Sequence, residues 1–136
     1  MKTPPREVLT KLPPGTGVNP ASLAQAGGAA VDLAALLGPD PLEAEFQAAV
    51  VQIAERAGWA CYHVPDSRRA TATGYPDLTC KRNRGGRRRV LVAELKRRGE
   101  KPRPDQRDWL EAFEECGAEA YFWTPDSLDT IREVLK

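Results

Sequence analysis

The chain has 136 residues, a length that suits a single domain with enough core to fold alone. Its 20 Lys and Arg residues and 19 Asp and Glu residues leave a net charge of +1, so total charge alone favours no charged partner. No apolar run reaches membrane-spanning length, and the N-terminus lacks the apolar segment of a signal peptide. We therefore expect a cytoplasmic protein with no membrane partner.

The first part of the chain is rich in Pro, Gly and Ala and poor in large apolar residues. Breaks such as Pro13-Pro14-Gly15 and Gly27-Gly28 interrupt any long element. The composition predicts a mostly flexible arm over residues 1–39, with a helical turn or two at Val31–Leu37. The folded domain is expected over residues 40–136.

The first long helix is predicted to begin at Asp40-Pro41-Leu42-Glu43. Asp40 can cap it, Pro41 suits the first helical position, and Glu43 completes a capping box. Two interpretations of Glu43 stay open, because a carboxylate at the inner edge of this helix can also point towards a site in the sheet. The helix carries one apolar stripe and ends at Gly58; the stripe consists of Leu42, Phe46, Ala49, Val50, Ile53 and Ala57.

A strand is expected at Trp59–Val64, followed by a loop over Pro65–Tyr75. The loop contains Ser67, Arg68 and Arg69. These residues can hold a phosphate, because arginine binds phosphate oxygens with two parallel hydrogen bonds. We predict a nucleic-acid contact here.

The next stretch has the pattern of a β-hairpin. Two short runs, Leu78–Arg82 and Arg88–Leu95, mix apolar and β-branched residues around an Asn- and Gly-rich break that contains Gly85-Gly86. If the two glycines form a two-residue primed turn, counting outward from them places Asp77 directly opposite Glu94. Directly opposed residues share a face of the ladder, and Lys96, two residues beyond Glu94, lies on that face as well.

Two opposed carboxylates repel each other unless a positive group lies between them. A divalent cation suits this position, because Mg²⁺ often uses only one or two carboxylates and keeps its other positions for water and phosphate oxygens. The alternative is a Pro-Asp turn with Glu94 and Lys96 on a solvated edge. The shared face of Asp77, Glu94 and Lys96 favours the metal site.

Basic residues concentrate around this acidic pair. Such a block suits a polyanion whose phosphates approach a metal, although a solvated hairpin tip would give the same composition. The Lys and Arg residues between positions 81 and 103 are Lys81, Arg82, Arg84, Arg87, Arg88, Arg89, Lys96, Arg97, Arg98, Lys101 and Arg103. We select Arg84, Arg87, Arg97 and Arg98 as nucleic-acid contacts.

A second helix is expected from Pro104 to Gly117, with a strand at Ala118–Trp123 and a closing helix at Asp126–Leu135. Gln106 lies on the inward face of the first turn and needs a hydrogen-bond partner, which either a loop carbonyl or the site can supply. The predicted order is α-β-β-β-α-β-α, an α/β fold with a mixed sheet flanked by helices.

The cysteines are odd in number, widely spaced and set among apolar residues; they are Cys61, Cys80 and Cys116. We expect reduced core residues and neither a disulfide framework nor a zinc site.

Several short motifs occur in a familiar order. They are Glu43-x-x-x-Gln47, Gly58-Trp59, His63-x-Pro-x-Ser67-Arg68-Arg69, Gly74-Tyr75-Pro76-Asp77-Leu78, Ala93-Glu94-Leu95-Lys96 and Gln106-x-x-Trp109-Leu110. With them, the chain resembles the PD-(D/E)XK nucleases and, more closely, the VRR-NUC (virus-type replication-repair nuclease) proteins of phages and bacteria. The resemblance spans about Leu42 to Trp123.

The resemblance implies a metal-dependent DNA endonuclease with a PD-(D/E)XK-like fold. Asp77, Glu94 and the Leu95 carbonyl would bind Mg²⁺ or Mn²⁺, and Glu43 matches the family's helix glutamate near the metal. Lys96 would orient the attacking water or neutralise charge on the phosphorane. Gln106 matches a glutamine that orients Lys96 or the water.

The resemblance also implies structured DNA such as junctions and flaps, replication or repair in a phage or bacterial cell, and a possible homodimer. The residues themselves do not distinguish DNA from RNA. Two alternatives stay open: a non-catalytic nucleic-acid-binding module, which the basic residues support equally well, and a restriction-type or toxin nuclease with the same chemistry. The chain shows no group suited to reading base edges, which weighs against the last.

Overall fold

A computed structural model of the chain describes residues 31–63 and 71–136. The helices and strands follow the predicted order α-β-β-β-α-β-α, which is confirmed. They are α3 (Glu43–Arg56), β1 (Ala60–His63), β2 (Leu78–Arg84), β3 (Arg87–Leu95), α4 (Pro104–Glu115), β4 (Glu119–Trp123) and α5 (Leu128–Leu135), with short 3-10 turns η1 (Ala34–Leu36) and η3 (Pro125–Ser127).

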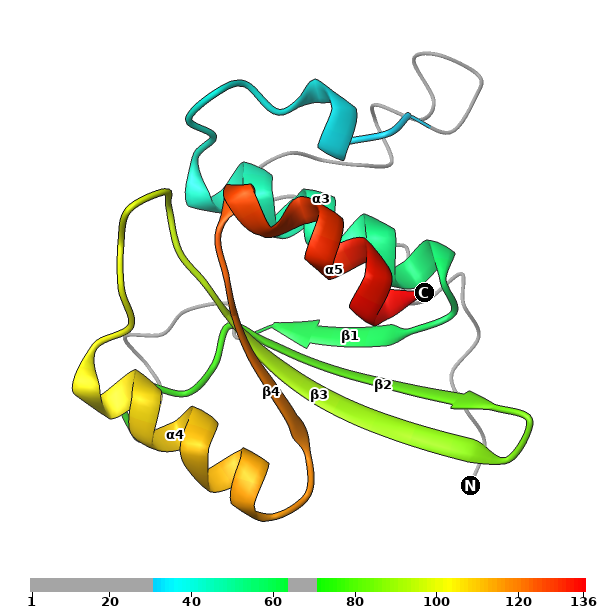
Figure 1. The fold of residues 1–136 in the computed structure, drawn as a ribbon, viewed down its shortest axis with the longest axis vertical. Coiled ribbons are helices and arrows are strands. Elements are labelled where there is room, and N and C mark those ends of the chain that lie inside the picture. Colours follow the sequence, from blue (N-terminus) through cyan, green and yellow to red (C-terminus); the bar gives the residue numbers. More distant parts are fainter. Residues whose placement is uncertain (1–30, 64–70) are drawn as a thin grey trace.

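The four strands form one mixed sheet in the order β1-β2-β3-β4. The first two pairs are antiparallel, and β3 and β4 are parallel. Helices α3 and α5 lie together on one side of this sheet and α4 lies on the other (Figure 1). The predicted α/β class with a mixed sheet flanked by helices is therefore confirmed.

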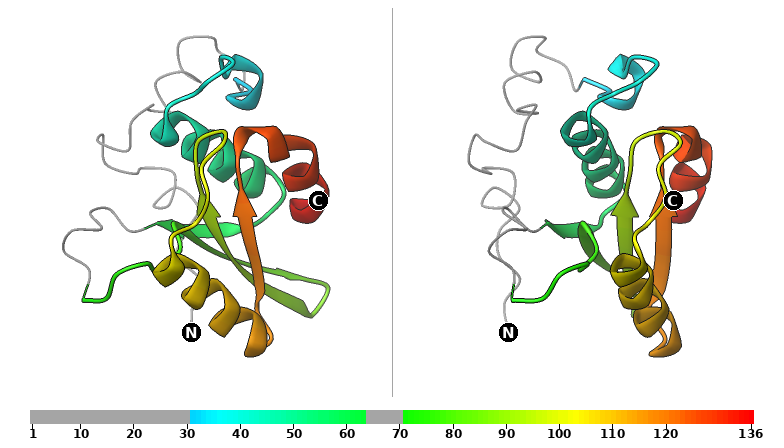
Figure 2. Two further views of the ribbon diagram at one scale, coloured as in Figure 1. Left: turned by 60° about the vertical axis from the view of Figure 1, so that its left-hand side comes forward. Right: turned by 90° about the vertical axis from the view of Figure 1, so that its left-hand side faces the viewer.

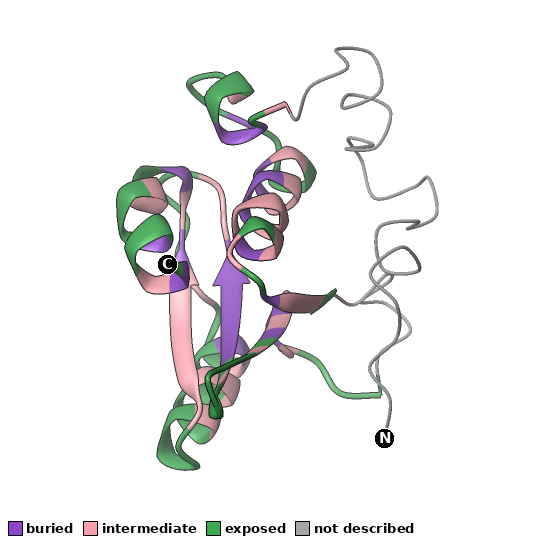
Figure 3. Ribbon diagram, turned by 90° about the vertical axis from the view of Figure 1, so that its right-hand side faces the viewer, coloured by how far each residue is buried: buried purple, intermediate pink, exposed green. Residues whose placement is uncertain are grey.

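The main core lies between the sheet and the pair α3 and α5. On α3, buried Phe46, Val50 and Ala54 recur at helical spacing, so one stripe of the helix faces the sheet. On β3 the last residues are buried on both faces, and this part of the strand is coloured as buried in Figure 3. A strand covered on both sides reads as a continuous apolar run, as Leu91–Leu95 does apart from Glu94.

The hairpin has the predicted register. Gly85 and Gly86 both have positive φ values, +59° and +81°, as the two central residues of a type I′ turn require. The ladder pairs Arg84 with Arg87 at the turn and runs to Leu78 and Ala93 at the other end. One more step in this register places Asp77 opposite Glu94.

The start of α3 differs from the expectation. Leu42 is the N-cap residue, and its backbone N–H donates to Glu45 Oε1 at 2.8 Å. Asp40 instead pairs with Arg97, whose Nη2 lies 2.8 Å from Asp40 Oδ2. The predicted cap at Asp40 and the capping box through Glu43 are therefore wrong, because the helix starts at Glu43 and places Glu45 at its third position.

Residues 31–37 pack against α3 (Figure 2). Leu33 is only 4% exposed and contacts the helix next to buried Ala49. The Gln52 side-chain amide forms two hydrogen bonds with the backbone of this segment. Its Oε1 accepts from Leu33 N–H at 2.8 Å, and its Nε2 donates to the Val31 carbonyl at 2.6 Å. The last residues of the predicted arm therefore pack as part of the domain. The division at residue 39 stays a prediction, and residues 1–30 lie outside the described ranges.

Three arginines of the hairpin donate hydrogen bonds to backbone carbonyls at the C-terminal ends of α3 and α5. Arg82 Nη1 donates to the carbonyls of Ala57 and Leu135, at 3.1 and 3.0 Å. Arg84 Nη2 donates to Ala57 O at 2.9 Å, and Arg89 Nη2 to Val134 O at 3.2 Å. The last carbonyls of a helix lack intrahelical donors and carry partial negative charge, so these contacts stabilise both helix ends.

The three cysteines are free thiols. Cys61 and Cys80 face each other across β1 and β2 in the main core, with their Sγ atoms 2.9 Å apart. Cys116 is exposed just after α4, so the expectation of a core position is wrong for this residue. Within the two described ranges, no helix is long and apolar enough to cross a membrane.

Candidate functional site

The candidate site lies where the hairpin meets the C-terminal end of β3. Asp77 immediately precedes β2, and its Oδ2 accepts a hydrogen bond from the Leu95 N–H at 2.8 Å. This bond fixes the Asp77 carboxylate against β3, beside Glu94. The expected meeting of Asp77 and Glu94 on one end of the hairpin thus follows from the register and from this contact.

Glu94 is an unusual residue for the inside of a sheet. It is 1% exposed, and its Oε1 is buried without a hydrogen-bond partner among the described residues. Its other oxygen, Oε2, lies 3.5 Å from Lys96 Nζ. A buried carboxylate oxygen without a partner is costly in free energy, so this atom calls for a positive ligand.

Three carboxyl groups at the site have a raised pKa. Burial, reinforced by the charge of Asp77, raises the pKa of Glu94 to about 7, and Lys96 opposes part of this effect. Burial also raises the pKa of Asp77, against the opposing hydrogen bond from Leu95 N–H. The pKa of Glu43 is raised as well, first by burial and then by Asp77. Burial and mutual repulsion therefore oppose the ionised forms of these carboxyl groups, and Lys96 offsets only part of that effect.

These residues fit a divalent cation. Within the described part of the chain, no three His, Cys, Asp or Glu side chains gather closely enough to form a ligand cluster on their own. The centre is thus a pair of carboxylates, Asp77 and Glu94, with one buried oxygen still free to accept a ligand. Mg²⁺ suits such a site, since it commonly binds one or two carboxylates and completes its shell with water and substrate oxygens.

Glu43 lies at the edge of this centre and does not cap its helix. Glu45 accepts the capping hydrogen bond, which leaves the Glu43 carboxylate on the first turn of α3. The charges of Asp77 and Lys96 both act on it. Of the two interpretations of Glu43, the cap is wrong, and its role towards a metal stays a prediction.

Gln106 is buried, 6% exposed, on the first turn of α4. Its Oε1 accepts the Arg103 N–H at 2.8 Å. Its oxygen is therefore bound to a backbone N–H at the helix start, which is neither of the two partners expected. A role for its amide nitrogen towards Lys96 or a water stays a prediction.

The segment that carries Asp77 into the site is held on α4, a feature that the sequence analysis missed. Gly74 has φ +88°, and a Cβ there would lie 2.7 Å from the Asp105 carbonyl carbon. The next residue, Tyr75, packs edge-on against Trp109, with ring centroids 5.2 Å apart, and Trp109 Nε1 donates to Thr73 O at 2.9 Å. In the sequence, Gly74 before Tyr75-Pro76-Asp77 is the residue that indicates this contact, because only glycine fits such a close approach at positive φ.

The predicted nucleic-acid contacts fall into separate groups. Ser67, Arg68 and Arg69 lie outside the described residues. Arg97 and Arg98 lie near the site end and pair with Asp40 and Asp126, at 2.8 and 3.0 Å.

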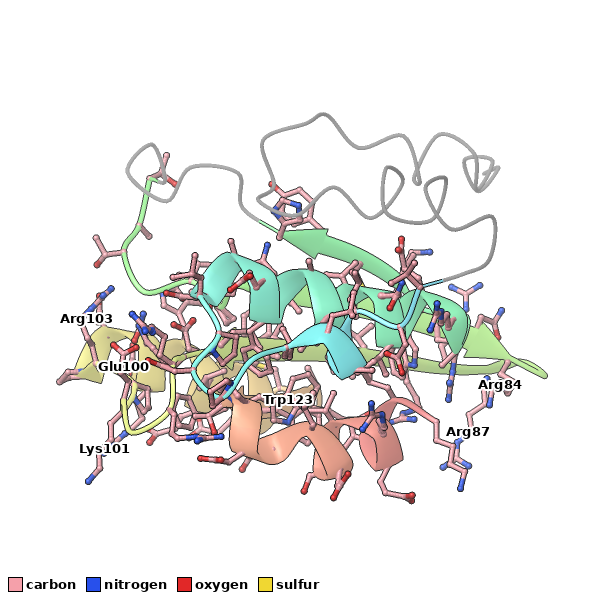
Figure 4. All side chains as sticks on the ribbon, turned by 90° about the horizontal axis from the view of Figure 1, so that it is seen from above. Arg84, Arg87, Glu100, Lys101, Arg103 and Trp123 are labelled. Atoms are coloured by element: carbon pink, nitrogen blue, oxygen red, sulfur yellow. The ribbon has the colours of Figure 1, made fainter. Side chains whose placement is uncertain are left out.

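The other two predicted contacts lie at the hairpin tip. Arg84 and Arg87 stand at the opposite end of the molecule from Glu100, Lys101 and Arg103 (Figure 4). Their order in the sequence suggested that the basic residues surround the acidic pair. In the structure they instead form two groups, one at each end of the hairpin.

The sheet, the flanking helices and the acidic pair with its lysine define a nuclease-type domain with a PD-(D/E)XK-like fold. The family model of the VRR-NUC domain matches residues 37–124, well over half of the chain. The chain therefore belongs to the VRR-NUC family. No curated protein and no solved structure matches it.

Proposed function

We propose that this protein is a metal-dependent endonuclease that hydrolyses phosphodiester bonds of DNA. The observation that carries the proposal is the Glu94 carboxylate, buried beside Asp77, whose Oε1 has no hydrogen-bond partner in the described part of the chain. A protein that only bound nucleic acid would gain nothing from two carboxylates placed where phosphates approach, because like charges repel. Membership of a nuclease family supports the same conclusion.

Asp77 and Glu94 are proposed to hold Mg²⁺ or Mn²⁺, with the Leu95 carbonyl as a third oxygen ligand and Glu43 at the edge of the shell. Once bound, the cation would polarise the phosphodiester and make a bound water more acidic. The hydrogen bond from Leu95 N–H keeps the Asp77 carboxylate oriented towards Glu94. This arrangement preorganises the two ligands before substrate arrives.

Lys96 is proposed to stabilise the transition state. Its side chain is 13% exposed and its Nζ lies 3.5 Å from Glu94 Oε2, so the lysine is held at the centre and partly shielded from water. A fixed positive charge in such a position favours the extra negative charge that develops on the phosphate. Gln106 is proposed to position Lys96 or the water through its amide nitrogen.

The experiment is a cleavage assay with Mg²⁺ or Mn²⁺ on linear duplex, single-stranded, flap and four-way-junction DNA. The family resemblance makes flaps and junctions the substrates to rank first. We expect wild type to cut, Lys96→Ala to lose at least about a hundredfold in rate, and Lys101→Ala, an exposed lysine nearby, to cut normally. Binding without cleavage by all three proteins would refute the proposal and favour a binding module.

A further inference from the structure

The hairpin extends beyond the sheet. β1 pairs with β2 only as far as Lys81, and β4 pairs with β3 only from Leu91. Residues 82–90 therefore form a two-stranded ribbon that none of the other described strands flanks, and it projects away from the sheet in Figure 1. A two-stranded ribbon has two faces, and the pairing register assigns each residue to one of them.

One face of the ribbon is occupied by internal contacts. Arg82 and Arg89 are paired across the ladder, and both guanidinium groups lie over the Trp59 ring, 4.6 and 4.9 Å from its centroid. Arg89 also forms two hydrogen bonds to Glu119, each 2.7 Å. These arginines and Arg84 hold the ribbon on the ends of α3 and α5 and are not free for a polyanion.

The other face is open. The pairs Lys81–Val90 and Asn83–Arg88 lie on it, and all four side chains are exposed. Because side chains alternate along a strand, this face also carries Asp77, Thr79 and Glu94, the end of the hairpin that holds the candidate metal site. At about 3.3 Å per residue, Lys81 lies roughly 13 Å from Asp77, and Arg88 lies about 20 Å from Glu94.

Helix α4 borders this face with the opposite charge. It packs on β3 and β4 and leaves the β1 and β2 half uncovered. Its exposed residues are mostly acidic: Asp108, Glu111, Glu114 and Glu115. A polyanion approaching the site is therefore repelled on the α4 side and attracted along the hairpin.

We propose that the open face of the ribbon binds the sugar–phosphate backbone of the DNA strand that enters the site, with Lys81 and Arg88 as its phosphate contacts. At about 3.4 Å per nucleotide along a duplex strand, these residues lie roughly four and six nucleotides from the scissile bond. Lys81 and Arg88 therefore take the place of Arg84 and Arg87, which lie on the occupied face, as the proposed nucleic-acid contacts of the hairpin. The path of the DNA strand from the ribbon to the site rests on the proposed nuclease function.

The test is binding of a fluorescein-labelled 30-base-pair DNA duplex, followed by anisotropy in EDTA at a series of KCl concentrations. We expect Lys81→Ala/Arg88→Ala to weaken binding about tenfold or more at 100 mM KCl and to lower the slope of log K against log salt by nearly 2. The control, Arg84→Ala/Arg87→Ala, removes the same charge from the opposite face and should change affinity less than about threefold. An equal loss in both variants, or none in the first, would overturn the proposal.

Folding and catalysis are read out separately. Lys81 and Arg88 make no side-chain hydrogen bond or ion pair with another described residue, so their variant should keep the wild-type Tm, whereas losing the Arg84 contact to Ala57 should lower the Tm of the control. If wild type never cuts but Lys81→Ala/Arg88→Ala loses affinity as expected, the nuclease proposal fails and the ribbon assignment stands. If wild type cuts and Lys81→Ala/Arg88→Ala binds normally, only the ribbon assignment fails.

Discussion

Replacing Glu94 by Gln in the metal-free protein should raise stability at neutral pH. Burial and the Asp77 charge raise the pKa of Glu94 from 4.5 to about 7, so the folded state holds a proton that the unfolded state releases. Stability of wild type therefore falls as pH rises from about 4.5 to 7 and then levels off. The shift corresponds to about 3 kcal/mol of lost stability, since each pKa unit is worth about 1.4 kcal/mol.

Urea unfolding in EDTA at pH 5, 6, 7 and 8 measures this difference. We expect the free energies of unfolding of wild type and Glu94→Gln to differ progressively between pH 5 and 7, with the variant ending more stable by about 2–3 kcal/mol. Glu111→Gln, an exposed substitution on α4, serves as the control and should follow wild type. Parallel curves for wild type and Glu94→Gln would refute the claim that Glu94 is a buried carboxylate without adequate compensation.

Three further predictions concern the scaffold of the site. Gly74→Ala should destabilise the protein by roughly 1–3 kcal/mol in thermal unfolding, because a Cβ there meets the Asp105 backbone. Gly99 also has a positive φ, +83°, but a Cβ there would meet nothing within 4 Å, so Gly99→Ala measures the backbone strain without the clash. Phe46→Ala should cost about 3–5 kcal/mol, since the ring is 1% exposed, and a loss under 1 kcal/mol would contradict its core position. Arg89 lowers the pKa of Glu119, so the stability advantage of wild type over Glu119→Gln should be present above about pH 4.5 and vanish as pH falls through the lowered pKa. A difference independent of pH would show that the ion pair does not act through charge.

Local rules were enough to predict the hairpin. Two adjacent glycines in a primed turn fix the register, and the register alone brings Asp77 opposite Glu94. The order of helices and strands followed from apolar periodicity in the same way. The central pair of the site could therefore be predicted without any knowledge of packing.

The helix cap could not be predicted as safely, because Asp40-Pro41-Leu42-Glu43 and Leu42-to-Glu45 are overlapping capping patterns. The structure selects the second, and tertiary contact decides it: Asp40 pairs with Arg97, far away in sequence. Competing local patterns of similar strength are settled only by such distant partners.

The roles of the hairpin arginines also could not be predicted from the sequence. Composition shows a basic hairpin, but it does not reveal that the ends of α3 and α5 lie under one face of it. Arg82, Arg84 and Arg89 bind carbonyls that come from Ala57, Val134 and Leu135, so their function depends on the packing of the whole domain.

The most direct test of the metal-dependent nuclease is cleavage of DNA by wild type and by Glu94→Gln in Mg²⁺, with folding of both proteins checked by urea unfolding. We expect wild type to cut and the variant to be inactive, while in EDTA at pH 8 the variant unfolds at a higher urea concentration than wild type, so that loss of activity cannot be attributed to loss of fold. Cleavage by Glu94→Gln at the wild-type rate would contradict the assignment of Glu94 as a metal ligand and, with it, the proposed function of the site.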